Sequence, residues 1–139
     1  MVALESPKGA AALKSLLELG TDPNLRNMAT VTPLMMATAN DDLESVALLL
    51  SFGADPTQGT WDGLTPLMVA ARRSRRAELL EALVSSGAPV DQPSGLGMTA
   101  LMVAAASGNT EGIRSLLALS ADVKLKDADG MTEIGRAHV

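Results

Sequence analysis

One six-residue pattern, Thr-x-Leu-x-x-Ala, recurs along this 139-residue chain at a nearly constant spacing. The pattern begins at Thr32, Thr65 and Thr99, so its copies lie 33 and 34 residues apart. Self-similarity at such a period is typical of a stack of supersecondary units, none of which buries its apolar face alone. The spacing therefore predicts a repeat array, which is stabilised mainly by the interfaces between adjacent units.

The segment 63–91 shows how one unit begins. The hydroxyl of Thr65 can accept a hydrogen bond from a free N–H of a first helical turn, which makes this residue a good N-cap. Pro66 follows at the first helical position, where its missing N–H and fixed φ suit a helix. The spacing of the next apolar residues then predicts a helix with one buried stripe, formed by Leu67, Ala70 and Ala71.

A second helix is expected over about 76–86 in the same segment. Gly87 falls just past its end, where a left-handed backbone favours glycine, and Pro89 prevents the helix from continuing. Its predicted apolar face consists of Leu79, Leu80, Leu83 and Val84.

The flanking copies predict helices at corresponding places. We expect a second helix over 10–19, whose first helix would lie near residues 1–6, and helix pairs over 32–52 and 99–119. We assign the one extra residue of the longer repeat to the Gly/Pro/Ser-rich loop 92–97.

Two sets of motifs resemble the ankyrin repeat family. The first set is TPLMMA (32–37), TPLMVA (65–70) and TALMVA (99–104), which is similar to the family's T-P-L-H-x-A with methionine in place of histidine. The second set is GTDPN (20–24), GADP (53–56), GAPVD (87–91) and SADV (120–123). The resemblance implies an all-α fold, an ankyrin-type helix-loop-helix solenoid with short hairpin-like loops.

This reading divides the chain into an ankyrin repeat array over 1–133 and a tail over 134–139. The array comprises a partial repeat 1–28, repeats 29–61, 62–95 and 96–128, and a partial repeat 129–133. We interpret the tail as non-native, because Ile-Gly-Arg-Ala-His-Val is the translation of a common sequencing adapter in one frame. The chain is then expected to be a fragment at both ends. The alternatives are a native start with a degenerate capping half-repeat and a native polar C-terminal cap.

Composition argues against several classes of function. The chain has no cysteine and a single histidine, His138, in the suspect tail, so the usual nucleophile–base pairs and most metal sites lack their residues. We therefore expect no enzyme activity, no cofactor, no metal and no small-molecule substrate. A net charge of −5 argues against nucleic-acid binding, and no apolar run in the sequence is long enough to cross a membrane. The expected location is intracellular, either cytoplasmic or nuclear.

The basic residues are concentrated in one turn. Four of the eleven lie within five positions, at Arg72, Arg73, Arg75 and Arg76. The resemblance implies that the end of a first helix and the loop before it face a concave groove. Arg72 and Arg73 would then lie beside residues of the loop before their own helix, Trp61, Asp62 and Leu64. Met98 of the next loop would be adjacent.

Trp and Arg often dominate the energy of an interface, so we predict that these residues bind a protein partner, with an acidic segment as the candidate ligand. The alternative is a solvated basic turn, with Trp61 folded onto its own repeat.

A non-catalytic protein–protein interaction scaffold is the preferred function. Its partner segment would lie in the concave groove, and no nucleic acid or membrane would be involved. One alternative is the ankyrin targeting module of a larger enzyme or channel whose other domains are absent from this fragment. A purely structural spacer is the third possibility.

Overall fold

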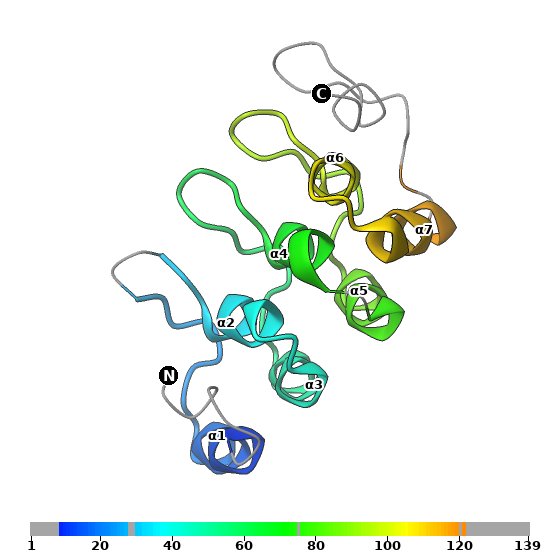
Figure 1. The fold of residues 1–139 in the computed structure, drawn as a ribbon. Helices are drawn as coiled ribbons and strands as arrows, with labels where there is room; N and C mark the ends of the chain where they lie inside the picture. Colours follow the sequence, from blue (N-terminus) through cyan, green and yellow to red (C-terminus); the bar gives the residue numbers. More distant parts are fainter. Residues whose placement is uncertain (1–8, 28–29, 75, 120, 122–139) are drawn as a thin grey trace.

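The computed structural model describes residues 9–27, 30–74, 76–119 and 121. Figure 1 shows their helices in two rows, with hairpin-like loops projecting on the side away from the second row. The first-helix layer consists of α2, α4 and α6, and the second-helix layer consists of α1, α3, α5 and α7. This arrangement confirms the predicted all-α array of helix pairs. The bounds are α1 Gly9–Glu18, α2 Pro33–Ala39, α3 Leu43–Ser51, α4 Pro66–Arg73, α5 Ala77–Ser85, α6 Ala100–Ala106 and α7 Thr110–Ala118.

The first helices begin where the repeated threonines predict. The side-chain oxygens of Thr32, Thr65 and Thr99 each accept a hydrogen bond from the backbone N–H three residues later, at 3.2, 3.4 and 3.4 Å. These threonines are buried, so each cap also satisfies a hydroxyl that water does not reach. The donors are the methionines that replace the family's histidine: Met35, Met68 and Met102.

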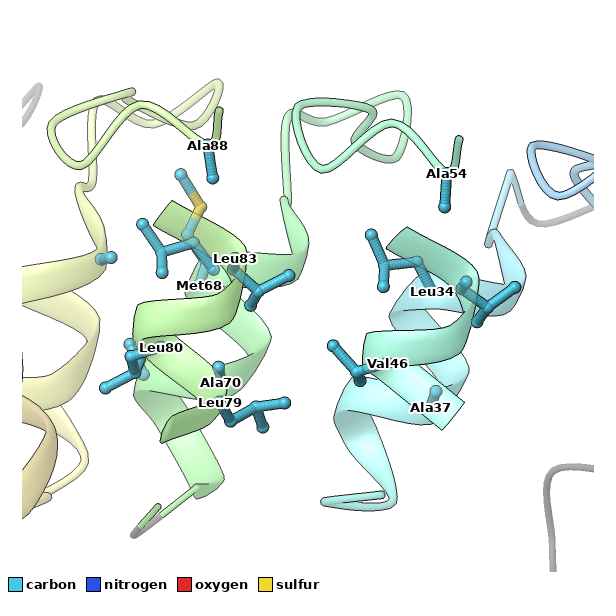
Figure 2. Packing of buried hydrophobic residues seen from close by; sticks show 14 of the residues in the cluster. Leu34, Ala37, Val46, Ala54, Met68, Ala70, Leu79, Leu80, Leu83 and Ala88 are labelled. Atoms are coloured by element: carbon cyan, nitrogen blue, oxygen red, sulfur yellow. The ribbon is translucent and has the colours of Figure 1, made fainter. Parts of the chain in front are cut away.

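Small residues let the first helices stack closely. Ala37, Ala70 and Ala104 are fully buried at corresponding positions of α2, α4 and α6, and α4 packs against both neighbours. Figure 2 shows the repetition from one unit to the next, with Ala37 and Ala70 in corresponding places and Val46 of α3 matched by Leu80 of α5. The core is therefore continuous along the array and is not divided into separate units.

The second helices end as predicted, at glycines with a left-handed backbone. Gly53 follows α3 with φ of 92°, and Gly87 follows α5 with φ of 111°. The residue after each glycine then donates its backbone N–H to a carbonyl near the end of the helix, Ala54 to Leu49 at 2.9 Å and Ala88 to Leu83 at 3.1 Å.

The assignment of the extra residue to loop 92–97 is wrong. Thr65 lies twelve residues after Gly53, and Thr99 lies twelve after Gly87, so the two loops are equally long. The extra residue lies in the turn between α4 and α5. In the turns after α2 and α6, the residue nine positions after the capping threonine has a left-handed backbone. It is Asp41 after α2, with φ of 55°, and Gly108 after α6, with φ of 68°. The corresponding Ser74 is extended, with φ of −79° and ψ of 134°.

Ser74 ends α4, which is one residue longer than α2 or α6, and α5 begins one position later than α3 or α7. The inserted residue is therefore accommodated by a wider turn, here called the arginine turn (72–76).

Several predictions fall outside the described residues. These are the first helix near 1–6, the partial repeat 129–133 and the non-native tail 134–139.

Candidate protein-binding surface

Two consecutive hairpin-like loops precede α4 and α6. In the hairpin 60–64, the Thr60 N–H donates to the Leu64 carbonyl at 2.9 Å. In the hairpin 94–98, the Ser94 N–H donates to the Met98 carbonyl at 2.8 Å. Both hairpins project to the same side of the first-helix layer (Figure 1).

Hydrogen bonds from backbone N–H groups join hairpin 60–64 to the loop before α2 and hairpin 94–98 to hairpin 60–64. The Trp61 N–H donates to the Thr30 hydroxyl at 3.2 Å, and the Gly95 N–H donates to the Asp62 carbonyl at 2.8 Å. The backbones of the two hairpins lie so close together that position 63 has no room for a side chain. A Cβ added to Gly63 would lie 2.9 Å from the Gly95 nitrogen. The hairpins therefore form a connected row whose tips are held relative to one another.

The tips of this row present large apolar side chains to solvent. Trp61 is 85% exposed and Leu96 is 72% exposed. Leu64 and Met98, at the base of the two hairpins, are partly buried. The alternative that Trp61 folds onto its own repeat is therefore wrong. The aromatic side chain of Trp61 therefore presents most of its surface to solvent.

Asp62 organises its own hairpin. The Thr60 hydroxyl hydrogen-bonds to its carboxylate, and this bond is the main cause that lowers the pKa of Asp62. The same hydroxyl oxygen accepts the Leu64 N–H at 3.2 Å. Asp62 is exposed, so its carboxylate is accessible while it supports the hairpin.

The four arginines of the arginine turn differ in their surroundings. Arg72 and Arg73 are exposed, and neither has a hydrogen-bond or ion-pair partner within the described part of the chain. Arg76 is committed elsewhere, because its Nε lies 3.3 Å from Oδ2 of Asp41. Arg75 lies outside the described residues. Among the described arginines of the turn, Arg72 and Arg73 are thus the two that are exposed without such a partner.

The structure does not bring Trp61 beside Arg72 and Arg73, so that part of the prediction is wrong. The hairpin 60–64 precedes α4, whereas the two arginines form its last turn. Six residues of helix, 66–71, lie between them, about 9 Å at 1.5 Å per residue, and the whole of α4 is about 12 Å long. The predicted residues form two separate surfaces, apolar at the hairpin tips and basic at the opposite end of α4.

The arginine turn is fixed from both neighbouring repeats. On one side, the Ser74 hydroxyl donates to Oδ1 of Asp41 at 2.7 Å. On the other, the Asn109 side-chain amide donates to the carbonyls of Ala71 and Ser74, each at 2.8 Å. Asn109 also caps α7, because its Oδ1 accepts the Gly112 N–H at 3.0 Å.

Sequence reasoning missed this anchoring. Asn109 stands directly before Thr110, so a helix cap could have been predicted, but its two long-range bonds have no local signal. Gly112 is explained by the same contact. A Cβ at that position would lie 2.5 Å from the Asn109 amide nitrogen, so the glycine makes room for the bridging side chain.

Across residues 9–27, 30–74, 76–119 and 121, no group of three or more His, Cys, Asp or Glu side chains is placed to hold a metal ion. Over the same ranges, no helix has the length and apolar character that a membrane span requires.

Comparison with known proteins identifies the class. The family model for ankyrin repeats, in three copies, matches residues 1–94 and again residues 34–127. The chain belongs to the ankyrin repeat family, as its motifs, capped first helices and stacked helix pairs require. Comparison with curated proteins gives no match. Ankyrin repeats are in general protein–protein interaction modules and are typically non-catalytic.

Proposed function

We propose that this array binds a segment of a protein partner on the side bounded by the hairpins and the first-helix layer. In this proposal the hairpin tips provide the apolar anchor through Trp61, with Leu96 of the next hairpin beside it in the row. Leu64 and Met98 form the base of the same surface, and Asp62 offers a carboxylate at its edge. Arg72 and Arg73 form a second contact at the other end of α4.

The exposure of Trp61 is the observation that supports this function most directly. Burying a side chain of this size stabilises a complex by about 1.5–3 kcal/mol or more, and Trp is enriched among the residues that dominate interfaces. The hydrogen bonds from Trp61 to Thr30 and from Gly95 to Asp62 fix the backbone at the tips. A partner therefore meets a preorganised surface and loses little affinity to ordering it.

The test compares two variants that remove equally exposed apolar side chains. Trp61 is 85% exposed at a hairpin tip, whereas Leu19 is 83% exposed just beyond α1 in the second-helix layer. Immobilised wild-type, Trp61→Ala and Leu19→Ala arrays are incubated with lysate, and the retained proteins are quantified by mass spectrometry.

We expect a defined protein to be retained by wild type and Leu19→Ala, and to be reduced about tenfold or more on Trp61→Ala. The proposal fails if every retained protein binds wild type and Trp61→Ala equally. Circular dichroism of the three arrays confirms that the variants keep the same helix content.

A further inference from the structure

Charge is divided between the two helix layers. Within α2, α4 and α6 the only charged residues are Arg72 and Arg73, because the sequences of these helices are otherwise apolar or uncharged. The second-helix layer has five acidic and two basic residues: Glu18, Glu44, Glu78, Glu81 and Glu111, with Lys14 and Arg114. An array with an overall charge of −5 thus carries a purely cationic first-helix layer.

Arg72 and Arg73 stand between small uncharged neighbours. The residues that correspond to Arg72 in the adjacent repeats are Ala39 and Ala106, at the ends of α2 and α6. Those that correspond to Arg73 are Asn40 and Ser107, which cap the same helices. Helix α4 packs between α2 and α6, neither of which contains an acidic residue. The acidic side chain that reaches the arginine turn, Asp41, is bound to Ser74 and Arg76.

The two arginines are not needed to complete the end of α4. The Ser74 N–H bonds the Ala70 carbonyl at 2.7 Å, and Asn109 satisfies the carbonyls of Ala71 and Ser74. The attraction of Arg72 and Arg73 to the negative end of the helix remains, but that interaction is worth only about 0.3–1 kcal/mol at an exposed site. Helix capping alone therefore leaves their hydrogen-bonding capacity unused.

We infer that Arg72 and Arg73 bind the carboxylates of an acidic segment of the partner. This inference rests on the proposed function and specifies the chemistry of the partner at one end of that surface. A guanidinium presents paired N–H donors that match a carboxylate, which makes arginine the better of the two basic residues for this contact. The acidic second-helix layer repels the same segment, so the charge division also selects the face on which it lies.

The geometry adds a spacing requirement. A partner that contacts both Trp61 and the arginine pair has to extend along α4, about 12 Å, which corresponds to about four residues of extended chain. The segment therefore carries its acidic residues at least about four positions from the large apolar residue that contacts Trp61.

The test uses a fluorescein-labelled all-glutamate peptide of about eight residues, long enough in extended form to cover α4 twice. Binding is measured by fluorescence anisotropy at low and at physiological salt, because contacts between exposed charges are screened by ions. Arg72→Ala/Arg73→Ala is compared with Lys14→Ala/Arg114→Ala, which removes the same charge from the second-helix layer. Arg114 lies 3.9 Å from Glu111, on α7.

We expect Arg72→Ala/Arg73→Ala to weaken binding about tenfold, and the control pair to change it less than about twofold. Equal losses in both variants would show that only net charge matters, and would overturn the inference. So would the absence of measurable binding to wild type, or tighter binding of an oligothymidine of equal charge with the same dependence on Arg72 and Arg73.

The outcome is separable from that of the proposed function. If Trp61→Ala releases a retained protein while the glutamate peptide does not bind, the apolar surface stands and the acidic-segment inference fails.

Discussion

Replacing Asn109 by aspartate tests whether its amide holds the arginine turn in place. Aspartate has the same shape and is an equally good helix cap, so the bond from the Gly112 N–H survives the change. The amide donor is lost, however. A carboxylate oxygen then faces the carbonyls of Ala71 and Ser74, to each of which the Asn109 amide nitrogen donates at 2.8 Å in the native chain. The substitution therefore separates the local role of Asn109 from its long-range one.

The magnitude follows from the two bonds removed. Each neutral hydrogen bond contributes about 1 kcal/mol net, so Asn109→Asp is expected to lower the free energy of unfolding by about 2 kcal/mol, with some added repulsion. Asn109→Ala loses the cap as well, worth about another 1 kcal/mol. For a chain of this length each kcal/mol shifts Tm by about 4 °C, so the expected decreases are about 8 °C and 12 °C.

The measurement is urea unfolding followed by circular dichroism, with a thermal melt on the same samples. The matched control is Asp42→Asn, the reverse exchange at the corresponding cap of α3. Asp42 accepts bonds from the N–H and the hydroxyl of Ser45, both within its own repeat, at 3.1 and 2.6 Å. We expect this control to change stability by less than about 0.5 kcal/mol, since both cap types are equivalent.

An Asn109→Asp array as stable as wild type would refute the reasoning, because it would mean that the bridge to α4 contributes nothing. A decrease of the same size for Asp42→Asn would also refute it, by showing that any exchange at a cap has this effect.

Two further predictions concern close contacts between repeats. Gly63→Ala is expected to lower the free energy of unfolding by at least about 2 kcal/mol, because it combines a left-handed backbone with a Cβ 2.9 Å from the Gly95 nitrogen. Gly53→Ala has the same backbone but no atom within 4 Å of its Cβ, so it should lower this free energy by only about 1 kcal/mol. Equal losses in urea unfolding would show that the packing of the hairpins is not tight. Ala70→Leu should lower the free energy of unfolding by about 1–3 kcal/mol, because the larger side chain forces α2, α4 and α6 apart. Ala106→Leu, on the exposed end of α6, should lower it by less than about 0.5 kcal/mol. Similar urea midpoints for both variants would contradict the close stacking.

The starts and ends of the helices were predicted well, because capping residues and closing glycines act on the backbone within a few positions of themselves. Thr65 and Pro66 predicted the start of α4, and the second helix expected over 76–86 is observed at Ala77–Ser85. Caps and left-handed glycines depend only on the backbone within one turn, so the sequence carries the information directly.

The candidate surface was predicted less completely. The exposure of Trp61 could not be read from its position, because a loop tryptophan can pack onto its own repeat or stand free. The expectation that it lies beside Arg72 failed because residues of one repeat were assumed to converge, whereas α4 holds them at its two ends. Arg76 was predicted as a binding residue, but the structure adds its ion pair with Asp41, a residue 35 positions away.

The sequence by itself determined the class of this protein: the period of 33 to 34 residues, the capped first helices and the closing glycines define an ankyrin repeat array. Only the tertiary structure decided which arginines are accessible and what fixes their turn. Asp41 and Asn109 reach the turn from the repeats on either side: Asp41 binds Ser74 and pairs with Arg76, and Asn109 binds the carbonyls of Ala71 and Ser74. Local propensity acts within a helix or turn, but the partners of a side chain across a stacked interface are set by how the repeats pack.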